Sequence, residues 1–93
     1  MHDSITRMMT NEVDTYLAVH EIEVGKSFEE GGREYWGFTC GSGFSTFDLP
    51  MNESKARYGA VVFSRLVKEL GMWFGDAEIL AQSYVTCYCV EGR

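Results

Sequence analysis

Few side chains in this 93-residue sequence belong to the types that carry out covalent or metal chemistry. Cys40 and His20 would form a nucleophile–base pair if the strands that carry them were neighbours. Cys87 and Cys89 form one CxC pair, which is half of the paired-ligand spacing of structural zinc sites. Because neither pattern is complete, we expect no catalytic residue, no metal and no cofactor. A cysteine-dependent enzyme that uses Cys40 and His20 is kept as an alternative.

Three cysteines are an odd and small number for a secreted domain held by disulfides. Cys87 and Cys89 would point to the same side of a strand, with Cα atoms near the upper limit for a disulfide, so we interpret them as small core side chains. The N-terminal residues MHDSITRMMTNEVD lack the pattern of a secretory signal. We therefore expect free thiols and a cytoplasmic location, in a bacterial cell or a phage host.

Glycine-rich phosphate loops are not indicated either. Gly31-Gly32, Gly41 and Gly43 lie between predicted strands rather than at the start of a helix, and neither GxGxxG nor GxxxxGK[ST] occurs. Gly41-Ser42-Gly43 also lacks the GxSxG spacing of a nucleophile elbow.

The charge distribution gives a stronger signal. The net charge is −6, and residues 1–53 carry ten acidic and three basic residues, whereas residues 54–93 carry four acidic and five basic residues. Such a protein is repelled by phosphate backbones and anionic membranes, so direct nucleic-acid or membrane binding is not expected. No apolar run approaches the ~20 residues of a membrane span.

The elements that would position these residues begin after a polar segment, residues 1–11, which predicts one helical turn or a loose chain. The run VDTYLAVHEIEV (13–24) is rich in β-branched and aromatic residues and alternates in its second half, which predicts a half-buried strand. In that strand Glu21 and Glu23 would share one face, about 6.6 Å apart.

The segment KSFEEGGREYWGFTC (26–40) predicts a hairpin, because Gly31-Gly32 supplies the two positive φ angles of a two-residue loop. We expect a short strand over residues 44–48 next, ended by Pro50. The predicted hairpin register pairs Glu30 with Arg33, Glu29 with Glu34, and Phe28 with Tyr35.

A single amphipathic helix is predicted between Asn52, as its N-cap, and Gly71, as its left-handed C-cap. Met72, Trp73 and Phe74 would then hold the following loop against the core. The apolar stripe comprises Ala56, Gly59, Ala60, Phe63, Leu66, Val67 and Leu70, and the polar side comprises Arg57, Ser64, Arg65, Lys68 and Glu69.

The last run, EILAQSYVTCYCV (78–90), has two apolar faces and predicts a central strand. The expected order is β-β-β-β-α-β. This order indicates a single α+β domain over residues 1–93, a two-layer sandwich in which one main helix covers one face of an antiparallel or mixed sheet of about four to five strands.

In that fold, the excess carboxylates would gather beside two aromatic side chains on one acidic ridge. Like charges that face each other cost stability, so we interpret the ridge as a binding surface for a basic partner. The candidate partner-binding residues are Glu21, Glu23, Glu29, Glu30, Glu34, Tyr35 and Trp36.

The leading hypothesis is a non-catalytic inhibitor that occupies the basic, nucleic-acid-binding groove of a partner protein. Small acidic inhibitors of bacterial immune (CRISPR) or restriction nucleases, which phages and plasmids carry, are similar in size and charge, an analogy of class that rests on no motif. The alternative is a homodimeric structural or accessory module, joined through the aromatic sheet face or an exposed edge strand.

Overall fold

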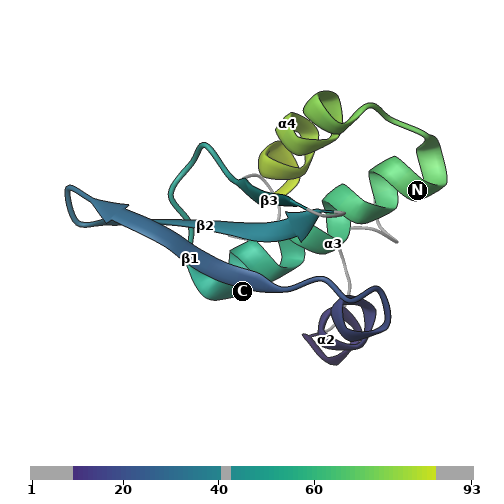
Figure 1. Ribbon diagram of the computed structural model, residues 1–93, viewed down its shortest axis with the longest axis horizontal. Coiled ribbons are helices and arrows are strands. Elements are labelled where there is room, and N and C mark those ends of the chain that lie inside the picture. The colour runs from purple at the N-terminus through teal and green to yellow at the C-terminus, as the bar shows by residue number, and fades with distance from the viewer. Residues whose placement is uncertain (1–9, 41–42, 86–93) are drawn as a thin grey trace.

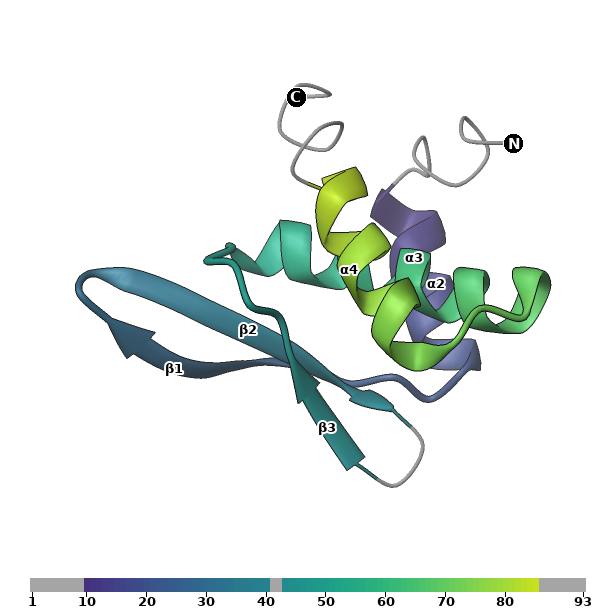
Figure 2. The ribbon, with the colours of Figure 1, turned by 90° about the horizontal axis from the view of Figure 1, so that it is seen from above.

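The computed structural model describes residues 10–40 and 43–85. Three strands form one antiparallel sheet in the order β1-β2-β3, and the described helices lie together on one side of it (Figure 1; Figure 2). The predicted α+β class is confirmed, but the described residues form three strands in place of four or five and three helices in place of one. The elements are α2 (Thr10–Val19), β1 (Val24–Glu30), β2 (Arg33–Cys40), β3 (Gly43–Thr46), α3 (Glu53–Leu70) and α4 (Phe74–Tyr84).

The β1–β2 hairpin forms at the predicted place. Gly31 and Gly32 have φ values of 62° and 80°, a left-handed conformation that glycine adopts without a Cβ clash. The hairpin tip extends beyond the end of α3 (Figure 1; Figure 2). The predicted register is confirmed, with the pairs Phe28–Tyr35, Glu29–Glu34 and Glu30–Arg33.

Side chains alternate between the two faces of β2. Phe38 is buried and Trp36 packs against the core, so both point toward the helices. Arg33, Tyr35 and Gly37 therefore point away from them. We call this second face, which no described helix covers, the open face (Figure 2).

A bulge changes the alternation in β1. The register shifts between Lys26 and Phe28, so Ser27 is the extra residue. As a result Lys26 and Glu29 both lie on the helix side although they are three positions apart, whereas Phe28 and Glu30 lie on the open face.

The central helix α3 has both predicted caps. The Asn52 side chain accepts a hydrogen bond from the Lys55 backbone N–H at 2.8 Å, and Gly71 ends the helix with a φ of 68°. One residue of the predicted polar side is misplaced: Ser64 is buried, and its Oγ lies 3.0 Å from the Tyr16 hydroxyl of α2. The pairing with Tyr16 satisfies a hydroxyl that would otherwise be costly to bury.

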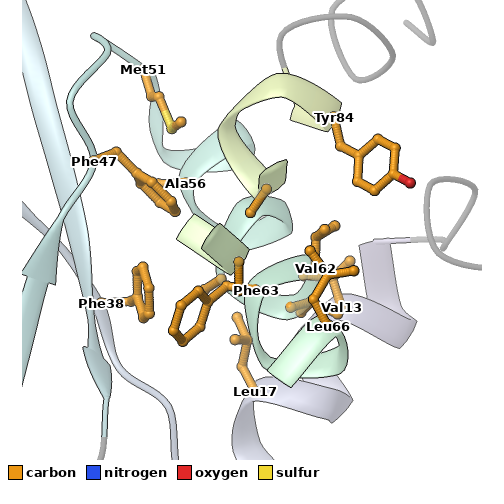
Figure 3. Packing of buried hydrophobic residues seen from close by; sticks show 14 residues of the cluster. Val13, Leu17, Phe38, Phe47, Met51, Ala56, Val62, Phe63, Leu66 and Tyr84 are labelled. Carbon is orange, nitrogen blue, oxygen red and sulfur yellow. The ribbon is translucent and has the colours of Figure 1, made fainter. Parts of the chain in front are cut away.

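Aromatic rings connect α3 to the sheet. Phe38 lies 4.8 Å from Phe63 and 5.1 Å from Phe47 between ring centroids, and Figure 3 shows the three rings pointing into the same interior space. The approach is close because α3 presents small residues there: a Cβ placed on Gly59 would come within 3.0 Å of Phe47 and 3.2 Å of Val85. Burial of these rings supplies much of the hydrophobic stabilisation.

The predicted strand over residues 13–24 is wrong, since residues 10–19 form α2. Val13 and Leu17 are one helical turn apart and both are buried in the core beside α3. Asp14 also accepts hydrogen bonds from Arg57 of α3, at 2.6 Å and 3.1 Å. These tertiary contacts outweigh the strand propensity of the β-branched residues.

The predicted final strand is also wrong in its described part, because residues 74–84 form α4; residues 86–90 of that strand lie outside the described residues. Ala77, Ala81 and Tyr84 recur at helical spacing and are buried. Gln82 is buried as well, and its Oε1 accepts hydrogen bonds from the backbone N–H groups of Asp48 (2.8 Å) and Leu49 (3.1 Å). This side chain joins α4 to the segment that follows β3.

The prediction that Trp73 and Phe74 hold the loop against the core is wrong in part. Trp73 is 74% exposed and Phe74 is 54% exposed, although the Phe74 ring still meets Phe63 edge-on at 5.8 Å. Met72 does pack against the core. The loop is short because α4 begins directly at Phe74, which leaves the Trp73 ring outside the packed layer.

Replacing Gly37 should destabilise the sheet. A Cβ at this position would collide with the Ser45 carbonyl oxygen and approach the Phe44 ring to 2.7 Å. We expect Gly37→Ala to lower the free energy of unfolding by about 1–3 kcal/mol, measured by urea denaturation. Gly25 is the matched control, since it pairs with Gly37 and nothing lies within 4 Å of its Cβ position. An equal loss in Gly25→Ala and Gly37→Ala would contradict this account.

Candidate functional site

Two glutamates face each other across the hairpin, as the sequence predicts. Glu29 and Glu34 are direct cross-strand partners on the helix side of the sheet. Lys26 lies beside both, with its Nζ 3.6 Å from Glu29 Oε1 and 3.9 Å from Glu34 Oε2. All three side chains are close to half exposed, so the lysine offsets the repulsion only partly. From the sequence, Glu29 and Glu34 were interpreted as a purely repulsive pair, without Lys26 beside them.

The two candidate aromatic residues lie on opposite faces. Trp36 packs against the core and its indole N–H donates to Glu34 Oε1 at 3.3 Å. Tyr35 lies on the open face, where its ring stacks on Phe28 with centroids 4.7 Å apart and planes within 8° of parallel. Of the two candidate aromatic residues, Tyr35 is therefore the one on the open face, beside Phe28. The Glu30–Arg33 pair lies on the same face at the hairpin tip.

Glu21 and Glu23 do not lie on a strand, which corrects the prediction that they share a strand face. Both belong to the connection between α2 and β1. Glu21 has a φ of 57°, the left-handed conformation that ends a helix. The Glu21 and Ile22 backbone N–H groups donate to Ala18 O (3.2 Å) and Leu17 O (2.9 Å), which is the hydrogen-bond pattern of a Schellman C-cap.

The five candidate glutamates therefore form two groups rather than one ridge. The strand-start acids are Glu21 and Glu23, and the hairpin acids are Glu29, Glu30 and Glu34. The seven residue-to-residue steps from 23 to 30 span about 23 Å in extended conformation, so β1 separates the groups. Because β1 is an edge strand of the sheet, Glu29 and Glu30 lie at an accessible edge, on its helix side and its open face respectively, whereas Glu34 lies on the central strand β2 beside Glu29.

His20 lies in the turn after α2, and not on an apolar strand face as expected. Its ring stacks on Tyr16, with centroids 4.0 Å apart, and its Nδ1 lies 3.1 Å from Lys68 Nζ. Cys40 is the last residue of β2. The side chain of Cys40 and the whole of Cys87 and Cys89 lie outside the described residues, so the cysteine-dependent alternative stays a prediction.

Metal, membrane and titration features add little to the candidate site. Within residues 10–40 and 43–85, no three His, Cys, Asp or Glu side chains converge on a place for a metal ion. None of the helices in the same ranges is long and apolar enough to cross a membrane. Burial, and secondarily the Asp48 carboxylate, raise the pKa of Glu78 on α4 above its usual value.

Comparison with known proteins gives no match: no family model fits the chain, and no curated protein or solved structure is significantly similar to it. What the protein does must therefore be inferred from its own structure.

Glycine at position 21 should stabilise the protein. A left-handed φ costs an L-residue such as glutamate about 1 kcal/mol relative to glycine. We expect Glu21→Gly to raise the free energy of unfolding by roughly that amount in urea denaturation. Glu23→Gly is the control, because residue 23 does not have a positive φ. Glycine there only increases the conformational entropy of the unfolded chain, which lowers stability. The interpretation fails if Glu21→Gly is no more stable than Glu23→Gly.

Removing Lys26, which lies between Glu29 and Glu34, should lower the free energy of unfolding. Lys26→Gln leaves Glu29 and Glu34 facing each other, and we expect a loss of about 0.5 kcal/mol in low salt. Added NaCl should reduce the loss because it screens exposed charges. Lys55→Gln serves as the control, since in the described part of the chain no carboxylate lies within ion-pair distance of Lys55. A loss at Lys26 that is independent of salt would rule out an electrostatic cause.

Proposed function

We propose that the protein is a small, acidic, non-catalytic binding protein that occupies a basic groove on a partner protein. The contact is made along the edge strand β1, with the strand-start acids at one end and the helix-side pair of hairpin acids, Glu29 and Glu34, at the other. A groove that normally holds DNA or RNA has the complementary charge, so occupancy would exclude the nucleic acid.

The observation that carries this proposal is the conformation of Glu21. Helices that end in a left-handed residue usually have glycine there, and a glutamate in this conformation lowers stability. Residues in costly backbone conformations are found most often where a function requires their side chain. A carboxylate at position 21 is therefore better explained by a role in binding than by a role in folding.

The hairpin acids give a second, similar indication. Glu29 and Glu34 are placed directly opposite each other, and the 3.6 Å and 3.9 Å contacts with Lys26 offset the repulsion only in part. Residual repulsion of this kind would be relieved by basic side chains of a partner. The tip also extends past α3, so it can enter a groove that the helices could not (Figure 2).

Long-range attraction would assist the encounter. A net charge of −6 raises the association rate with a basic surface at low ionic strength and suppresses contact with acidic ones. Inhibitors of CRISPR and restriction nucleases carried by phages and plasmids work in this general way, and we propose that this protein belongs to the same functional class.

The test is capture of partners from extracts of the source cells by the tagged protein. We expect the captured proteins to bind nucleic acid, to be released by added duplex DNA, and to be retained at about 50 mM but not about 500 mM NaCl. The variant Glu21→Gln/Glu23→Gln, which keeps the chain length and side-chain shape, should lose about tenfold or more in affinity for the captured partner.

The matched control is Glu53→Gln/Asp76→Asn, which removes the same charge from the first turns of α3 and α4. Its affinity for the captured partner should be within about threefold of that of the unmodified protein, because only the long-range electrostatic attraction is reduced. Equal losses in the two double variants would assign the effect to net charge. Binding that is insensitive to salt and to both double variants would refute the proposal.

A further inference from the structure

The open face of the sheet carries exposed aromatic side chains. Phe28 is 48% exposed and Phe44 is 53% exposed, and the half-buried Tyr35 stacks on Phe28. The Phe44 ring lies over Gly37, which has no side chain to cover it. Exposed aromatic side chains that gather on one face, together with polar groups such as the Ser27 and Thr46 hydroxyls (2.8 Å apart), are common in surfaces that another protein covers.

The same face carries one acid and one base at matching positions. Glu30 of β1 and Arg33 of β2 are direct cross-strand partners, and Phe28 and Tyr35 occupy the equivalent positions two residues further from the tip. Consider a twofold axis that runs parallel to the strands, above the open face and midway between β1 and β2. Rotation about this axis places β1 of one copy over β2 of the other. Each Glu30 then meets the second copy's Arg33, and each Phe28 meets the second copy's Tyr35.

We propose that the open face is a homodimer interface with this twofold symmetry. It differs from the basic-groove contact, which uses the edge of β1 with the strand-start acids and the helix-side pair Glu29 and Glu34, because Glu30 lies on the open face opposite Arg33. The dimer contact does not depend on the groove contact. A basic partner has no electrostatic preference for a face on which Glu30 and Arg33 cancel, whereas a second copy is complementary at both positions.

Face-to-face packing is also favoured over pairing through the edge of β1. The bulge at Ser27 interrupts the ladder of β1, and bulges of this kind discourage the addition of a further strand. Two sheets that pack face to face need no free backbone groups, because contact is made by the side chains.

The size of the face sets the expected strength. The strands have seven, eight and four residues, and at about 3.3 Å by 4.8 Å for each residue they give a face of about 300 Å² per copy. Stable dimers bury about 800 Å² per partner, so we expect a weak, reversible dimer that forms only at high protein concentration.

The experiment is sedimentation equilibrium of the full chain up to about 1 mM, with two charge-reversal variants studied separately and mixed. Glu30→Arg and Arg33→Glu should each weaken self-association at least tenfold, because like charges then meet across the axis. An equimolar mixture of E30R and R33E should associate as strongly as the unmodified protein, because opposite charges meet in the heterodimer only. The mixture is decisive because each chain in it still carries like charges at positions 30 and 33, so recovered association can come only from contact between the two chains.

Two further variants identify the surface. Phe28→Ser should abolish association, whereas Trp73→Ser, which removes the most exposed aromatic side chain of the described helix layer, should leave it intact. Thermal melting of each variant confirms that it is folded. A monomer at all concentrations, failure of the mixture to associate, or loss in Trp73→Ser without loss in Phe28→Ser would overturn the proposal. Because Glu21→Gln/Glu23→Gln should still dimerise, failure here is distinguishable from failure of the groove contact.

Discussion

The packing of α3 against three neighbours at once determines where the rest of the described chain lies. One side of this helix meets the rings of Phe38 and Phe47, and further residues meet α2 and α4. Such contact requires small residues at the crossing points, which Ala56, Gly59 and Ala60 provide. Since the described helices all lie on one face of the sheet, no described helix covers its open face or the outer edge of β1.

The parts of the fold that were predicted correctly are those with strong local signals. The two glycines of the hairpin and the caps of α3 each determine backbone geometry within a few residues, and all are found as expected. The helices α2 and α4 were mistaken for strands because their apolar residues fall on more than one side and the sequences around them contain β-branched and aromatic residues. What decides their conformation is contact with α3, through Leu17 and Ala81 for example, and that contact is invisible in local sequence.

In the candidate site, too, the positions that were predicted correctly are those that a local sequence signal determines. The facing Glu29–Glu34 pair follows directly from hairpin register, whereas the shared face of Glu21 and Glu23 depended on a strand that does not exist. The position of Lys26 between the hairpin acids depends on the bulge at Ser27, which turns Lys26 and Glu29 to one side. A left-handed glutamate also has no sequence signal, because glycine is the residue that pattern analysis expects there.

The hydrogen bonds accepted by Gln82 have a consequence for the order in which the chain matures on the ribosome. The two backbone donors at Asp48 and Leu49 precede Gln82 by 34 and 33 positions. During synthesis, the turn before α3 therefore emerges before the side chain that holds it. The sheet and central helix can collapse early, but the segment after β3 is fixed in its final arrangement only after α4 has left the exit tunnel.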